Sequence, residues 1–197
     1  AGRQDFINVA DGYDVSLVAA WGHPVTPGAP AFNVEAQTPE AQAQQFGYNC
    51  DFIGYFGLPN PPSSDSNRGL LAVNHEYTNP ELMFRNYVAG SPTRAQVDIE
   101  IAAHGLSIIE VARQPRAWEM VAGSRFNRRY TGETPMELTG PAAGDEALRT
   151  SQDPTGRRVR GTLNNCSGGN TPWGTVLTAE ENFNQYFGNV NALPDGP

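Results

Sequence analysis

The stretch Leu106-Ser-Ile-Ile-Glu-Val-Ala-Arg113 is rich in aliphatic and β-branched side chains and predicts a β-strand. Gln114-Pro115-Arg116 follows it, and Trp118–Val121 then supplies a second short strand pattern. Because a proline-containing turn lies between these two patterns, we expect them to pair as a hairpin. This hairpin favours a fold built mainly from β-sheet.

Other segments of the chain also have the composition of strands. The expected strands are Tyr13–Ala20, Asp51–Leu58 and two short buried ones, Gly69–Asn74 and Gly174–Ala179. The chain contains 21 Gly and 16 Pro, which favours short strands joined by turns and long loops. We therefore expect a mostly β fold, and the pattern alone leaves a sandwich and a propeller open.

Two helices and one helical turn complete the expected elements. The first helix is Pro80–Tyr87, with Thr78-Asn79 as its cap, and the second is Thr93–His104. Gly105 stands where a glycine commonly ends a helix, and a short turn is expected at 182–187. The segment Gly123–Gly161 shows no clear period, and so long an irregular stretch is expected to be functional or disordered.

The charge of the chain excludes several classes of function. The net charge is −8, and all 13 basic side chains are arginines. An acidic surface disfavours nucleic acid and anionic membranes as partners. The absence of lysine excludes a Schiff-base lysine and a P-loop lysine within this chain. No segment reaches the ~18 apolar residues of a membrane span, whereas an acidic chain suits the binding of hard cations.

Asn74-His75-Glu76 is the first segment that could carry chemistry. It follows a predicted buried strand, and a strand end is a common place for the residues of a site. Glu76 offers two oxygens to a metal ion, and His75 offers a ring nitrogen. The alternative is an ordinary strand end with a solvated glutamate.

A second candidate is the run Asn164-Asn165-Cys166-Ser167-Gly168-Gly169. Its glycines allow a ligand to approach the backbone closely. As a thiolate, Cys166 could be a metal ligand or a nucleophile, with His75 or His104 as the base. It could equally be a small buried residue in a tight turn. Cys50 is the second of two cysteines, so one disulfide between them remains an option.

The acidic pair Glu180-Glu181 follows the predicted strand Gly174–Ala179. On a regular strand the two carboxylates would point to opposite faces, and an inward carboxylate is costly unless it is paired or metal-bound. A helix N-terminus at Glu180 is the competing interpretation. Arg128 and Arg129 could grip a phosphate, although a solvated charged face is the simpler reading, and the segment 153–156 (DPTG) predicts a turn.

Taken in order, several blocks of the chain resemble the PhoX-type alkaline phosphatases. The most specific is GTLNNCSGGNTPWGTVLTAEENF at 161–183. Weaker blocks precede it in the expected order: GYNCDF at 47–52, VNHEYT at 73–78, AAHGLSIIEV at 102–111, NRRYT at 127–131, TPM at 134–136 and GPAAG at 140–144. The resemblance covers nearly the whole chain.

This resemblance implies a β-propeller fold and an active site that holds ferric iron and calcium ions. It implies that Cys166 ligates iron and that Glu76 binds metal. It also implies that one or both of Glu180 and Glu181 bind metal, without showing which, and that Asn165 is a further candidate oxygen ligand. No catalytic residue is assigned. Thiolate suits iron, and carboxylate and amide oxygens suit calcium.

The implied activity is the hydrolysis of small-molecule phosphate monoesters. It would take place in the periplasm or outside the cell, after export by the twin-arginine route. PhoX-type proteins run to several hundred residues, so we expect residues 1–197 to be the N-terminal part of a larger propeller-type domain. Two alternatives remain: a non-catalytic propeller that binds a ligand or partner, and a related calcium-dependent lactonase or phosphodiesterase.

Overall fold

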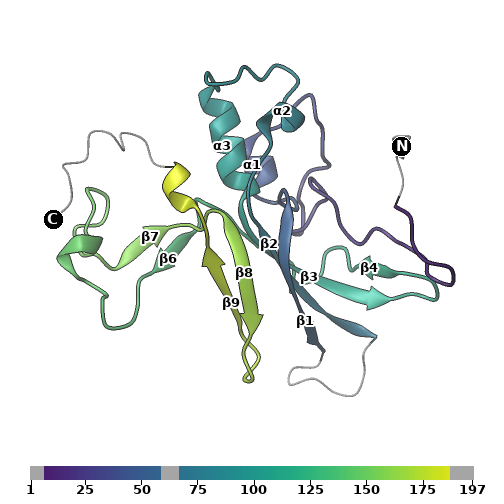
Figure 1. The fold of residues 1–197 in the computed structure, drawn as a ribbon. Coiled ribbons are helices and arrows are strands. Elements are labelled where there is room, and N and C mark those ends of the chain that lie inside the picture. Colours follow the sequence, from purple (N-terminus) through teal and green to yellow (C-terminus); the bar gives the residue numbers. More distant parts are fainter. Residues whose placement is uncertain (1–6, 59–66, 187–197) are drawn as a thin grey trace.

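The computed structural model describes residues 7–58 and 67–186 of the chain. Its main sheet is antiparallel, with strands in the order β1 (Cys50–Gly57), β2 (Arg68–His75), β3 (Gly105–Arg113) and β4 (Trp118–Met120). A further strand, β5 (Arg128–Tyr130), also pairs with β3. The expected hairpin is confirmed, since Val111 pairs with Met120 and Arg113 with Trp118. The described part is mostly β with a few short helices, as expected (Figure 1).

Two smaller hairpins follow the main sheet. One consists of β6 (Pro135–Glu137) and β7 (Arg158–Arg160), and the other of β8 (Asn165–Asn170) and β9 (Val176–Glu180). The second hairpin lies beside the main sheet, with β8 next to β1 (Figure 1). Asn74 in β2 joins them, because its side-chain amide donates to the carbonyls of Cys166 and Ser167 at 2.9 and 3.1 Å.

The helices are short and lie at one end of the main sheet (Figure 1). They are α1 (Pro39–Gln42), α2 (Pro80–Met83) and α3 (Arg94–Ala103), with 3₁₀ turns η1 (Glu146–Leu148) and η2 (Phe183–Tyr186). Thr93 and Gln96 form a capping box that satisfies backbone N–H groups at the start of α3. Gly105 follows the last helical turn with φ +94°, and a side chain there would collide with the carbonyl of Tyr130.

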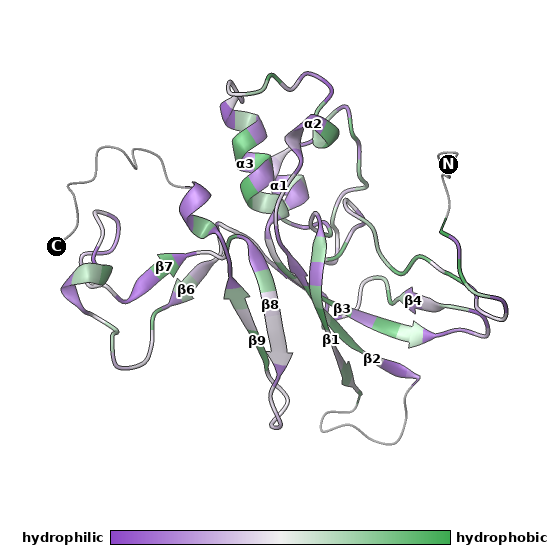
Figure 2. Cartoon of the chain, in the orientation of Figure 1, coloured by the Kyte–Doolittle hydropathy of each residue, from purple (hydrophilic) through white to green (hydrophobic). Residues whose placement is uncertain are grey.

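The core lies on both faces of β3. Leu106, Ile108, Ile109 and Val111 are all buried, so both faces of this strand are covered. Figure 2 shows the hydrophobic residues concentrated along β2 and β3. A separate cluster of Met83, Ile99 and Ala103 packs α2 against α3.

Several expectations from the sequence are corrected by the structure. Residues 13–20 form no strand: Val15 and Leu17 are 55% and 70% exposed, and no strand among residues 7–58 and 67–186 pairs with them. The helix expected to reach Tyr87 ends at Met83, because Phe84 adopts an extended conformation and packs on the α2–α3 cluster. Asn79 makes no side-chain cap there.

The other two corrections concern the C-terminal half. The strand expected to be buried at 174–179 is present as β9 but is largely exposed, since it is the second strand of a two-stranded sheet. The segment 123–161 is not irregular throughout, because it contains β5, β6, η1 and β7. These strands have three residues each, too short for a periodic pattern to be visible in the sequence.

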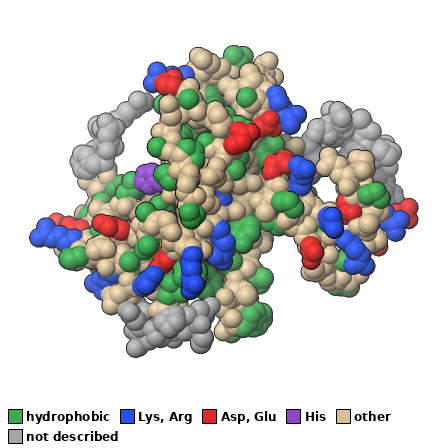
Figure 3. Space-filling model, turned by 180° about the vertical axis from the view of Figure 1, so that it is seen from behind, with side chains coloured by type: hydrophobic (Ala, Val, Ile, Leu, Met, Phe, Trp, Pro, Cys, Tyr) green, Lys and Arg blue, Asp and Glu red, His purple; other side chains and the backbone are tan. Residues whose placement is uncertain are grey.

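The surface shows no segregation of charge on the face seen from behind. In Figure 3, arginine and acidic side chains are spread over the same face. Among the described residues, no helix has the length and apolar character that crossing a membrane requires.

Candidate metal centre

The candidate site lies where the ends of two hairpins meet. Asp51 is at the start of β1 and Glu76 directly follows β2, and these strand ends are neighbours because Cys50 pairs with His75. Cys166 is at the start of β8 and Glu181 directly follows β9, and these ends are neighbours because Asn165 pairs with Glu180. Since β8 lies beside β1, the adjacent hairpins bring both pairs to one place.

Three of these side chains converge closely. One carboxylate oxygen each of Asp51 and Glu76 and the Sγ of Cys166 lie within 4.8 Å of one another. Asp51 is exposed, whereas Glu76 and Cys166 are half-buried. Thiolate and carboxylate groups at such distances are a suitable donor set for a multivalent cation.

The electrostatics of the three groups are unfavourable without a cation. Hydrogen bonds with the carboxyls of Glu181 and Asp51, together with burial and their charges, raise the pKa of Cys166 to about 12. Burial, followed by the charge and a hydrogen bond of Asp51, also raises the pKa of Glu76. Like charges held this close favour protonated forms. A bound cation would reverse this balance and favour the thiolate and the carboxylates.

The two adjacent glutamates have different surroundings. The Oε1 of Glu180 accepts hydrogen bonds from the Oγ1 of Thr162 at 2.8 Å and from the N–H of Leu163 at 2.7 Å. Glu180 therefore holds the connecting segment that leads into β8. The carboxyl of Glu181 instead acts on the thiol of Cys166, whose pKa it raises. The structure thus brings Glu181, and not Glu180, to the cluster.

Asn165 lies beside Cys166 in the chain and is fully buried. Its Nδ2 donates to Thr178 Oγ1 at 2.8 Å, and that hydroxyl donates to Asn74 Oδ1 at 2.9 Å. Its Oδ1 has no hydrogen-bond partner among the described residues. A buried amide oxygen without a partner is costly, so this atom is suited to accept an ion or a water.

The two histidines near the site serve the core instead. His75 is fully buried, and its Nε2 contacts Ser107 Oγ at 2.7 Å and accepts from the N–H of Gly47 at 3.3 Å. Burial, with a smaller effect of Arg129, lowers the pKa of His75 well below its usual range. It is not among the residues that converge on Cys166. His104 hydrogen-bonds Tyr186, and neither ring contacts the thiol as a base would.

The remaining candidates from the sequence have structural roles. Arg129 donates to the carbonyls of Ala102 and His104 at 2.9 and 2.8 Å, so these contacts hold its guanidinium in the fold. Arg128 is exposed. Cys50 and Cys166 are both free thiols, so no disulfide joins them.

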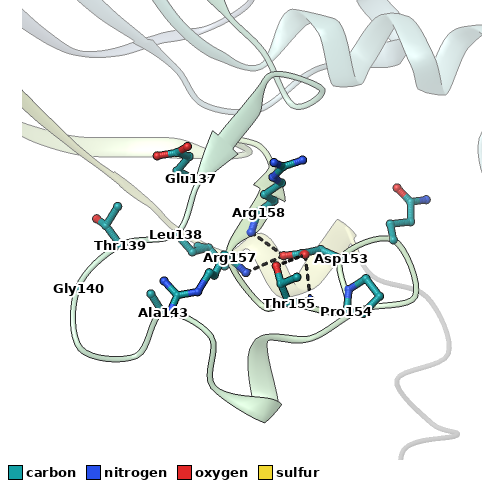
Figure 4. A pocket seen from close by; sticks show the side chains of 11 residues that line it. Glu137, Leu138, Thr139, Gly140, Ala143, Asp153, Pro154, Thr155, Arg157 and Arg158 are labelled. Carbon is teal, nitrogen blue, oxygen red and sulfur yellow. Dashed lines mark hydrogen bonds between the residues drawn. The ribbon is translucent and has the colours of Figure 1, made fainter.

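A pocket of about 810 Å³ lies away from the cluster, between the loops of the β6–β7 hairpin. Figure 4 shows the carboxylate of Asp153 hydrogen-bonded at its rim to Thr155, Arg157 and Arg158. The expected turn at 153–156 is therefore confirmed. None of the cluster residues lines this pocket, so its size is no guide to the chemistry.

Sequence reasoning missed Asp51, which it treated only as the first residue of a strand. The signal was present in the block GYNCDF, where an acidic residue opens a strand beside a cysteine. It also missed Tyr186, whose phenol contacts His104 from η2. Both depend on contacts between segments that are distant in the sequence, such as His104 and Tyr186, which are 82 residues apart. No local pattern records such contacts.

Comparison with known proteins supports the earlier resemblance. The family model described as "Alkaline phosphatase PhoX" matches residues 1–195. Among solved structures, Pseudomonas fluorescens PhoX in complex with vanadate, a transition state analogue, is similar with a TM-score of 0.85 and 42% sequence identity. The match covers 95% of this chain and 32% of that structure, so the chain spans about a third of its length. No curated protein matches the chain significantly.

Proposed function

Because this chain belongs to the PhoX family of alkaline phosphatases, we propose that it is part of an enzyme that hydrolyses phosphate monoesters with bound metal ions. The observation that carries this proposal is the convergence of Asp51, Glu76 and Cys166 within 4.8 Å. These residues come from two hairpins, and no requirement of local structure places a thiol between two carboxyl groups.

The donor atoms suggest how the metals are divided. The sulfur of Cys166 would hold ferric iron, since soft thiolate ligands suit iron. The oxygens of Asp51, Glu76 and Glu181 would hold calcium and complete the coordination of iron. The unpartnered Oδ1 of Asn165 makes it a further candidate oxygen ligand. Glu180 is left out of this set because its Oε1 already accepts from Thr162 and Leu163 and it is not among the converging residues.

The residues of the chain would hold the cations and position the substrate's phosphoryl group beside them. When bound, multivalent cations polarise phosphoryl oxygens and stabilise the charge that develops on the attacking and leaving oxygens. They also offset the net charge of −8, which would otherwise repel a phosphate dianion. The described residues provide no histidine or lysine at the cluster, and we assign no general base.

The fold and the location of the enzyme belong to the same proposal. We infer that the main sheet and the β8–β9 hairpin are parts of a β-propeller, with the site at one end of its strands. The chain spans about a third of the similar solved structure. We therefore assign the complete activity to the full-length protein and not to residues 1–197 alone. We propose that the enzyme acts in the periplasm or outside the cell after twin-arginine export, which cell fractionation would test.

The experiment compares Cys166→Ser with the wild type in the full-length protein. Iron and calcium are measured by elemental analysis, and hydrolysis is followed with a chromogenic phosphate monoester. We expect Cys166→Ser to lose iron and activity while keeping its circular dichroism spectrum. Cys50→Ser is the matched control, because Cys50 is also a free thiol on a neighbouring strand, and it should keep both.

Two results would count against the proposal. One is a wild-type protein that is fully active after its metals have been removed by a chelator. The other is a Cys166→Ser protein with unchanged iron content and rate. A parallel panel of a phosphodiester and a lactone tests the related esterase activities, which would require those substrates to be hydrolysed faster than the monoester.

A further inference from the structure

His104 forms a fixed hydrogen-bond acceptor behind the metal centre. It caps the C-terminus of α3 and is 1% exposed. Its Nδ1 lies 2.7 Å from the carbonyl oxygen of Glu100, and a carbonyl can only accept, so Nδ1 carries a proton. Burial lowers the pKa of His104, which keeps the ring neutral. The Nε2 atom must then be an acceptor.

Tyr186 donates its hydroxyl proton to this acceptor. The phenol oxygen lies 2.9 Å from His104 Nε2, and the two rings pack edge to face with centroids 5.0 Å apart. Tyr186 belongs to η2, which begins two residues after Glu181. The hydrogen bond therefore ties the segment carrying Glu181 to the end of α3.

Asn164 connects the segments that carry the two glutamates. Its backbone is left-handed, with φ +53°, and asparagine is one of the few residues that adopts this conformation readily. Its Nδ2 donates to the carbonyl of Glu76 at 3.3 Å, and its own carbonyl accepts from the N–H of Glu181 at 2.9 Å.

We propose that His104, Tyr186 and Asn164 form a positioning triad that sets the separation of Glu76 and Glu181 around Cys166. The three residues contact the backbone or the adjoining segment of each glutamate, so they act through these residues and are not catalytic themselves. His104 anchors Tyr186 at the end of α3, and Asn164 joins the two glutamates just before β8. This inference rests on the proposed function, because it assigns the triad to a metal centre.

Positioning of this kind has a measurable size. Partners that orient metal ligands typically contribute about tenfold to hundredfold in metal affinity or activity. We therefore expect Tyr186→Phe, which removes one hydroxyl group, to weaken the binding of Ca²⁺ by about tenfold or more. Asn164→Gly keeps the left-handed backbone accessible and removes the amide, and we expect a loss of similar size.

The test uses full-length holoprotein. Calcium affinity is measured by competition with a chelator, the rate is measured with a phosphate monoester, and the melting temperature is measured without metal. Excess Ca²⁺ should restore much of the rate of Tyr186→Phe, because the ligands themselves are intact. Tyr13→Phe is the matched control, since Tyr13 is 72% exposed, and it should resemble the wild type.

The outcomes separate this inference from the function on which it rests. A wild type that binds no metal and hydrolyses no ester contradicts the proposed function itself. A wild type that does both, with Tyr186→Phe or Asn164→Gly showing unchanged Ca²⁺ affinity, overturns the triad alone. The triad is also overturned if either variant lowers only the melting temperature of the metal-free protein.

Discussion

Glu180 and Glu181 are identical side chains one residue apart with different surroundings. Glu180 is held by a hydroxyl and a backbone N–H, and Glu181 reaches the thiol of Cys166. Adjacent residues at a strand end point in different directions, so one faces the preceding loop and the other the cluster. The directions of the two side chains, and not their residue type, thus decide which glutamate acts on Cys166.

This difference predicts unequal effects of two matched substitutions. Glu181→Gln should weaken metal binding by at least about tenfold, because the carboxylate charge beside Cys166 is lost. Glu180→Gln keeps an oxygen that can accept from Thr162 and Leu163, and its metal content should match the wild type. Elemental analysis after dialysis measures both. Equal loss in the two variants would contradict the assignment of Glu181.

The loop between β6 and β7 is an element organised by one carboxylate. Asp153 accepts from the hydroxyl and N–H of Thr155 and from the N–H groups of Arg157 and Arg158. The hydroxyl of Thr155, followed by these backbone donors, lowers the pKa of Asp153 to about 2. A carboxylate in the unfolded chain titrates near ~3.9.

The sign of the resulting pH dependence follows from this lowered pKa. The folded state favours the ionised form, so the contribution of Asp153 to stability is present above about pH 4 and is lost as the pH falls towards 2. Asp153→Asn should be less stable than the wild type at pH 6 and should lose less stability between pH 4 and pH 2. Urea unfolding at several pH values measures this. Asp11→Asn, in an exposed turn, serves as the control.

At the scale of the whole molecule, the site joins two separate sheets. The main sheet and the β8–β9 hairpin meet through the hydrogen bonds of Asn74 and through the acidic cluster. Without cations, burial and then the charges of Asp51 and Glu181 raise the pKa of Glu76, and this cost opposes the contact between the sheets. Bound metal would therefore stabilise the fold as well as the chemistry.

Metal removal should accordingly lower the melting temperature. A cation at a hundred times its Kd stabilises the folded protein by about 2.7 kcal/mol if it does not bind the unfolded chain. Differential scanning calorimetry with a chelator, and then with added Ca²⁺, should show a drop of several degrees and its recovery. Cys166→Ser should show a smaller drop. A melting temperature that changes neither with the chelator nor with added Ca²⁺ would refute this coupling between metal binding and folding.

The sequence by itself determined the β class, the hairpin of β3 and β4, the span of α3 and the membership of the PhoX family. Those features depend on local patterns: apolar runs, a glycine at position 105 that ends a helix, and an unusual block around Cys166. Glu76 and Cys166 were candidates for the same reason, since their residue types and strand-end positions are visible along the chain.

Only the tertiary structure decided that Asp51 joins them, that Glu181 and not Glu180 faces the thiol, and that residues 13–20 form no strand. Each of these depends on which segments become neighbours in space: β1 beside β8, or no strand beside Val15 and Leu17 within the described residues. Side-chain direction at a strand end and the presence of a pairing partner are properties of the assembled sheets, and a single segment does not carry them.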